Sequence, residues 1–184
     1  MNEHPGQRRR SVISRIAASM LVTAFVSMIL IVPGVADESS GKIKAAFTDS
    51  SWDGETVPVK GICTSNGGKG MSPGIAFTNI PPGAKEIVLK FTDEDWGSEG
   101  AHGEFSISVP SGSSTLDLPE FSGDSGALPP GTTMLAGHVC GSCGGVGYLG
   151  PCSNGRGHSY YANIYVLDGE GNKIDGSYIV LGRY

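Results

Sequence analysis

Basic side chains are scarce in this sequence once its first fifteen residues are set aside. The chain of 184 residues has 13 lysines and arginines against 18 acidic residues, and its formal net charge is −5. The only basic block lies in residues 1–15. Because nucleic-acid binding requires a clustered basic surface, the sequence excludes this class of function.

The sequence carries no convincing pattern of catalysis. The letters G-x-S-x-G occur once, as GMSPG at residues 70–74, but they end a glycine-rich loop that leads into an expected strand, and the motif of a nucleophilic serine lies between a strand and a helix. There is no G-x-x-x-x-G-K-[ST] loop for nucleotide phosphates. A Ser-His-Asp set could be assembled only by choosing freely among many serines. We therefore expect a protein that is not an enzyme and has no cofactor.

Helical periodicity is also lacking after residue 36, and the 29 glycines disfavour long helices. Short alternating runs bounded by turn residues instead predict an all-β sandwich or barrel-like fold, with no internal repeat and no second domain. The expected strands are residues 42–47, 56–63, 75–80, 86–93, 102–110, 159–168 and 178–183. We expect residues 111–133 to be a long polar crossing segment, and the glycine-rich residues 137–157 to be a loop.

Residues 1–36 are typical of an export signal. Four arginines precede an apolar run from Ile16 to Val32, and small residues at Gly34 and Ala36 predict cleavage after Ala36. Two alternatives stay open: the segment could remain as an uncleaved membrane anchor, and export could use the twin-arginine route, with Arg9 and Arg10 as the arginine pair. Cleavage would remove four arginines and one glutamate, leaving residues 37–184 as one domain with 9 basic and 17 acidic side chains, a net charge of −8. We expect this domain to be periplasmic or extracellular and not to span a membrane.

The four cysteines are Cys63, Cys140, Cys143 and Cys152. In an exported protein an even number predicts two disulfides, in any of three pairings. The alternative is a zinc site formed by Cys140, Cys143, Cys152 and His158, but the spacing C-x2-C-x8-C-x5-H is not typical of zinc ligands. The oxidising compartment favours disulfides.

Two acidic residues and a histidine are the first candidate ligands. Asp93 and Asp95 follow an expected strand, and alternate residues point the same way, so their carboxylates could share one face. His102 begins the next expected strand. The alternatives are a solvated acidic turn for the aspartates and an edge position for the histidine.

The segment "GPCSNGRGHSYYANIYVLD", residues 150–168, supplies the second group of candidates. Gly150 and Pro151 form a rigid turn, and successive backbone N–H groups of such loops can make an anion-binding nest. His158 and Tyr160 lie two residues apart at the start of a strand, so both side chains face one side. A phosphate or carboxylate could bind among them. In this hypothesis Asp93 and Asp95 orient and charge the imidazoles, or bind a cationic amine of a headgroup.

Together these segments resemble the phosphatidylethanolamine-binding protein family, also called Raf-kinase-inhibitor-like proteins. The resemblance covers about residues 57–168. It rests on "CTSNGGKGMSPGIAFTNIPPGAKEIVLKFTDED" and on the Gly-Pro turn followed by His-x-Tyr and a strand that ends in Leu-Asp. It implies a β-sandwich-like fold around a small anion pocket that binds phosphate-like groups. Position by position, it places in that pocket Asp93, Asp95, His102, Gly150, Pro151, His158 and Tyr160.

The sequence departs from this family at identifiable points. Glu94 stands between the two aspartates, where the family usually has proline, and the residues after Asp168 leave no room for the helix that usually precedes the C-terminal tail. The segment "GHVCGSCGGVGY" is unusual and predicts a disulfide-bound local elaboration.

We therefore expect an exported, non-catalytic binding protein with a pocket for a small anion or phospho-headgroup. The alternative is a protein-interaction module, or an inhibitor of an extracytoplasmic kinase or protease, in which the pocket is vestigial. The sequence leaves open the identity of the ligand or partner and the oligomeric state.

Overall fold

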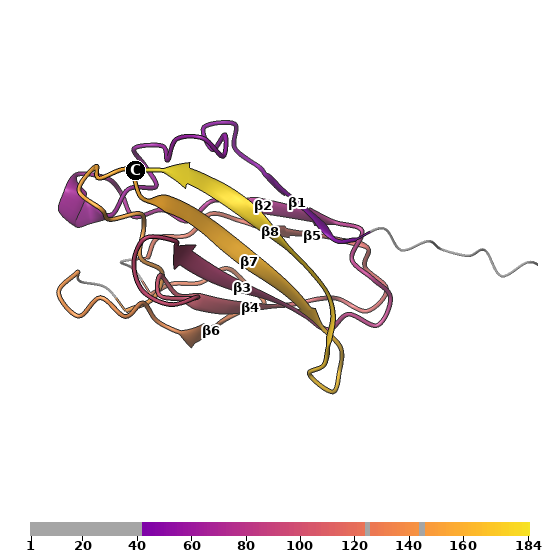
Figure 1. Cartoon of the computed structure of the whole chain (residues 1–184). Coiled ribbons are helices and arrows are strands. Elements are labelled where there is room, and N and C mark those ends of the chain that lie inside the picture. The colour runs from indigo at the N-terminus through magenta and orange to yellow at the C-terminus, as the bar shows by residue number, and fades with distance from the viewer. Residues whose placement is uncertain (1–41, 124–125, 144–145) are drawn as a thin grey trace, which may run out of the picture. The chain divides into compact units, whose positions relative to one another are not determined.

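The computed structural model describes residues 42–123, 126–143 and 146–184, all within one compact unit, Glu38–Tyr184 (Figure 1). The expected export signal, residues 1–36, lies outside the described residues. Among the described residues no helix is long and apolar enough to cross a membrane.

Eight strands form two antiparallel sheets (Figure 1). The smaller sheet has the order β1-β2-β5, with β1 Lys44–Phe47, β2 Ile75–Thr78 and β5 Thr115–Leu118. The larger sheet has the order β6-β4-β3-β7-β8, with β3 Glu86–Asp93, β4 Glu104–Ser108, β6 Thr132–Ala136, β7 Ser159–Leu167 and β8 Lys173–Arg183. In the described part of the chain the helical element is one short 3-10 turn, η1 Thr64–Asn66.

The core lies between the two sheets. Along β7 buried residues alternate with partly exposed ones, as expected for a strand with one face in the core. Its inward side chains, such as Ile164, join Leu89 of β3 and Phe77 of β2 in a single buried cluster. Burial of this apolar surface, at about 25 cal/mol per Å², is the main force that holds the sheets together. The predicted mainly-β sandwich is confirmed.

Two expectations about the strands were wrong. Residues 56–63 were expected to be a strand, but after a single β-bridge at Thr56 they form turns. The backbone N–H of Gly61 donates to the carbonyl of Pro58 at 2.8 Å and closes a tight turn. This turn packs against Trp52 so closely that a Cβ on Gly61 would lie 2.4 Å from the indole ring. The expected crossing segment 111–133 contains β5 and the beginning of β6.

The connection from β7 to β8 is direct, as the sequence predicted. Asp168 accepts hydrogen bonds from the backbone N–H groups of Glu170 and Asn172, at 3.0 and 2.8 Å, and these bonds form the turn. Hydrogen bonding lowers the pKa of the Asp168 carboxyl. The largest cause is the bond from the Asn172 side chain, and the backbone N–H groups of the turn add to it. No helix separates the two strands. The loop before β7 contacts the end of β8, where the Arg183 guanidinium donates to the carbonyl of Gly157.

Candidate functional site

A cavity of about 300 Å³ opens at one end of the larger sheet. It lies where β3 ends and where the loop 149–158 enters β7. Around it are side chains from three separate parts of the sequence: Asp93, Trp96, His102, Cys140, Ser142, Cys143, Leu149, Cys152, Ser153, Asn154, Arg156 and His158. The structure thus brings together three of the predicted ligands, Asp93, His102 and His158.

Asp93 is the central residue of this site. It is the last residue of β3 and only 3% exposed. Its Oδ2 atom lies 2.8 Å from Nδ1 of His158, and its Oδ1 atom accepts the backbone N–H of Asp95 at 2.9 Å. Because Nδ1–H of His158 donates to this carboxylate, the Nε2 atom of that ring is left for other partners.

The backbone around His158 is fixed from the end of β8. The carbonyl of His158 accepts the N–H of Tyr184 at 3.1 Å, and the guanidinium of Arg183 donates to the carbonyl of Gly157 at 2.7 and 3.0 Å. These hydrogen bonds to the carbonyls of Gly157 and His158 hold the loop in one position, which preorganises the site.

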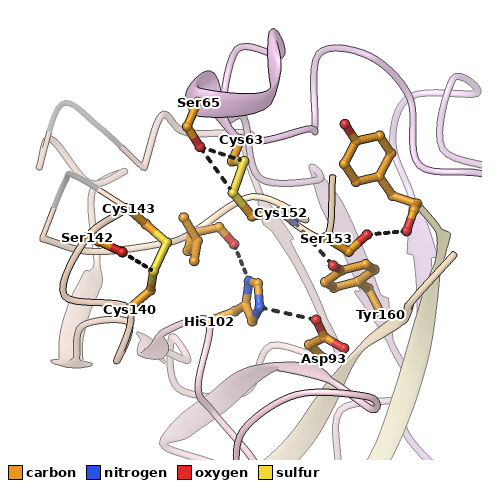
Figure 2. Close-up of a disulfide and its surroundings, with 12 residues drawn as sticks. Cys63, Ser65, Asp93, His102, Cys140, Ser142, Cys143, Cys152, Ser153 and Tyr160 are labelled. Atoms are coloured by element: carbon orange, nitrogen blue, oxygen red, sulfur yellow. Dashed lines mark hydrogen bonds and ion pairs between the residues drawn. A yellow bond between two sulfur atoms is a disulfide. The ribbon is translucent and has the colours of Figure 1, made fainter. Parts of the chain in front are cut away.

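The ring of His102 also faces the Asp93 carboxylate (Figure 2). Its Nδ1–H donates to the carbonyl of Leu149 at 2.8 Å, and its Nε2 atom is 3.9 Å from Oδ2 of Asp93. The side chain is almost fully buried, and this burial is the main cause that lowers its pKa below 6.5. In this arrangement the neutral imidazole presents Nε2 as an acceptor.

The lowered pKa of His102 predicts a pH-dependent stability. At pH values between its lowered pKa and 6.5, the unfolded chain binds a proton that the folded chain does not. The free energy of unfolding should therefore decrease as the pH falls through 6.5. Thermal unfolding across this range should show a smaller decrease for His102→Asn, because asparagine does not titrate there. Equal pH dependence in the variant and the wild type would contradict the prediction.

Tyr160 lies behind the cavity and does not line it. It is buried, its hydroxyl oxygen accepts the N–H of Cys152 at 3.2 Å, and burial is the main cause that raises its pKa to about 12. Its ring stacks on that of His158, with centroids 6.4 Å apart, and meets His102 edge-on at 5.4 Å. Tyr160 therefore supports both imidazoles from the core.

Gly150 and Pro151 also lie behind the cavity lining. The carbonyl of Pro151 accepts the N–H of Cys63 at 3.0 Å, and a Cβ on Gly150 would lie 2.3 Å from the carbonyl oxygen of Gly61. Only glycine permits this close approach of two backbones. In the structure this pair fixes the loop against residues 61–63.

Asp95 is exposed and accepts the backbone N–H of Ser159 at 2.9 Å. It holds the start of β7 and does not contact an imidazole in the hydrogen bonds that the structure shows. Ligand atoms of Asp93, Asp95 and His158 lie within 4.8 Å of one another, a spacing that a metal ion could use. The carboxylates are already engaged, however, with the ring of His158 and with backbone N–H groups.

Sequence reasoning missed Arg156 and Trp96. Arg156 is exposed and lines the cavity two residues before His158. It is one of only two arginines after residue 36, and this scarcity is the signal that could have identified it. Trp96 meets the ring of His102 edge-on, with centroids 5.9 Å apart.

Both predicted disulfides are present, as Cys63–Cys152 and Cys140–Cys143 (Figure 2). All four sulfur atoms are therefore bonded to sulfur, which is incompatible with the alternative of a zinc site. The first bridge joins residues 89 apart in sequence and fixes the loop 150–152, and the second closes a turn at the rim of the cavity.

The family model of the phosphatidylethanolamine-binding protein matches residues 48–179. The fold is similar to that of Escherichia coli YbcL, described as a new member of the mammalian PEBP family, with a TM-score of 0.56, 18% identity and coverage of 78% of this chain and 98% of that one. It is also similar to the putative phosphatidylethanolamine-binding protein homologue CT736 from Chlamydia trachomatis, with a TM-score of 0.55, 23% identity and coverage of 78% and 97%. No curated protein matches the chain.

Proposed function

This chain belongs to the phosphatidylethanolamine-binding protein family, and from that premise we propose that it is an exported, non-catalytic binding protein that holds a small phosphate-type anion in the cavity beside His158. A free phosphate and the phosphate of a lipid headgroup share this chemistry.

The observation that carries the proposal is the set of charges around the cavity. The guanidinium of Arg156 and the ring of His158 line it together with one carboxylate, that of Asp93. This carboxylate accepts the Nδ1–H of His158, which leaves Nε2 of that ring for a ligand. Although the whole chain is acidic, its cavity therefore offers an anion a positive side chain, Arg156, with an imidazole beside it. A volume of about 300 Å³ is at the lower end of the range for small-molecule sites and suits a headgroup.

The hydroxyl groups of the lining support a non-catalytic role. Ser153 is buried and donates its hydroxyl proton to the carbonyl of Tyr184. Its side chain is thus directed at the backbone, while a nucleophilic serine must be bonded to a general base. Asp93 and His158 form an oriented pair but have no serine bonded to them in the hydrogen bonds that the structure shows.

Calorimetric titration tests the function. Phosphoethanolamine and inorganic phosphate should both bind, and ethanolamine, which carries the amine without the phosphate, should not. Binding of ethanolamine alone would overturn the assignment of the cavity to anions.

Export is a separate part of the proposal and has its own test. The N-terminal sequence of the protein purified from its native cell should begin at Asp37, because the expected cleavage follows Ala36. The protein should be recovered outside the cytoplasm. An intact N-terminus on a cytoplasmic protein would contradict the export signal.

One observation favours the second candidate function, a protein-interaction module. The edge strand β6 and the loop after it carry exposed apolar side chains, namely Met134, Leu135, Val139 and Val146. Unpaired strand edges and apolar patches are typical of protein contacts. Affinity capture from an extracytoplasmic extract, with Leu135→Lys as the matched variant, tests this candidate. A specific partner that Leu135→Lys loses and His158→Ala keeps would support it.

A further inference from the structure

We propose that the Cys140–Cys143 disulfide is a site of thiol–disulfide exchange, at which a soluble dithiol reduces this bond while Cys63–Cys152 stays oxidised. Cys140, Cys143 and Cys152 line the same cavity, but the two bridges differ in two properties that control reduction: the length of the loop they close and the access to their sulfur atoms.

Loop length makes the two bridges unequal. Cys63 and Cys152 are 89 residues apart in sequence, and Cys140 and Cys143 are 3 residues apart. A disulfide stabilises a fold more when it closes a longer loop. By linkage, the fold stabilises that disulfide against reduction by the same amount. The fold therefore protects Cys63–Cys152 strongly and Cys140–Cys143 weakly.

Access to the sulfur atoms differs in the same direction. Cys63 is only 2% exposed, and the hydroxyl of Ser65 contacts both sulfurs of its bridge, at 3.2 and 3.3 Å. Cys140, Cys143 and Cys152 are all partly exposed, so the long-loop bridge has one accessible sulfur and the short-loop bridge has two. The N–H of Cys143 contacts the carbonyl of Cys140 at 3.3 Å, so the chain forms a local turn that keeps the two sulfurs near each other after reduction. The pair can then be reoxidised without a rearrangement of the sandwich.

The charge of the cavity favours attack by a thiolate. The guanidinium of Arg156 lines the cavity that Cys140 and Cys143 also line. This positive group attracts the incoming thiolate and stabilises the thiolate that leaves. The carboxylate in the same lining, Asp93, is bonded to His158.

The exchange is a two-electron reaction in two steps. A thiolate of the soluble dithiol attacks one of the two sulfurs, the Cys140–Cys143 bond breaks, and the released cysteine takes up a proton. The second thiol of the reagent then loses its proton and displaces the other cysteine. The products are the cyclic disulfide of the reagent and two protein thiols, so the dithiol is oxidised and the protein is reduced.

Dithiothreitol, alkylation and peptide mapping test the proposal on the folded chain. Samples are taken over time, blocked with iodoacetamide and analysed by mass spectrometry. Cys140 and Cys143 should be labelled at least about tenfold faster than Cys63 and Cys152, because access and loop length both favour them. Equal rates, or faster labelling of Cys63 and Cys152, would overturn the proposal.

Charge variants separate an assisted exchange site from an ordinary exposed bridge. Arg156→Gln should slow the reduction of Cys140–Cys143 by roughly threefold, because it removes the nearby positive charge. The matched control is Lys44→Gln, which removes a charge from exposed Lys44 on β1, outside the cavity lining, and should leave the rate unchanged. A rate that Arg156→Gln does not alter would overturn the assignment of an assisted site.

Inorganic phosphate supplies a final comparison, and this arm alone rests on the proposed anion pocket. A phosphate held beside Arg156 would repel the attacking thiolate, so saturating phosphate should slow the reduction. Protection would support the exchange site in the same cavity. Fast and selective reduction without protection would leave the exchange site standing and overturn the anion pocket.

Discussion

Replacing both Cys63 and Cys152 with serine is expected to lower the free energy of unfolding by about 4 kcal/mol, the order given by the chain entropy of an 89-residue loop. In the structure this bridge ties the loop that carries Gly150 and Pro151 to residues 61–63, where the backbones are in close contact. Its loss should therefore loosen the segment that leads to His158. Urea denaturation followed by circular dichroism measures the effect.

The matched control is the pair of substitutions Cys140→Ser and Cys143→Ser, which removes the same atoms. Because these cysteines are 3 residues apart, the same relation gives a loss of about 2 kcal/mol at most. If the control loses as much stability as Cys63→Ser/Cys152→Ser, the long-loop bridge does not hold the fold in the way described.

The second large effect is expected at His158. His158→Ala should weaken the binding of phosphoethanolamine by about ten- to a hundredfold, since a charge-assisted hydrogen bond contributes roughly 1.5–3 kcal/mol. The imidazole is oriented by Asp93, at 2.8 Å, and lines the cavity. The change can be measured by calorimetry, with the melting temperature recorded for each variant.

Arg156→Gln is the companion variant. His158→Ala also removes a partner of the buried Asp93 carboxylate, so a loss of binding could reflect a disturbed site. Arg156 is exposed, and its replacement should weaken phosphoethanolamine binding about tenfold without lowering the melting temperature. Wild-type affinity in both variants would contradict the role of these two side chains in binding.

The strands that sequence analysis located well are those with strong side-chain patterns. Residues 86–93 and 159–168 were predicted because their apolar and β-branched residues are dense and bounded by turn residues, and they became β3 and β7. Residues 56–63 have a similar alternation, but contacts with Trp52 and the end of β8 override it. β5 was missed because Thr115–Leu118 is short and is paired by a distant strand, β2, that no local pattern reveals.

The site was predictable only in part, for a related reason. The sequence indicated Asp93 and His158 as chemically suitable residues, but the contact between them depends on the register of β3 and β7, which places Asp93 opposite Tyr160. The same register places Tyr160 next to Asp93, where its buried ring contacts the imidazoles of His102 and His158. Disulfide pairing likewise depends on the tertiary fold, because five strands, β2 to β6, lie between Cys63 and the loop that carries Cys152.

The most direct test of the anion pocket is nuclear magnetic resonance of the histidine side chains during a titration of the wild-type protein with inorganic phosphate. The ring resonances of His158 should move in a saturable way, because Nδ1 is bonded to Asp93 and Nε2 is left for the ligand. If the His158 resonances stay unchanged at millimolar phosphate, the cavity is not an anion site.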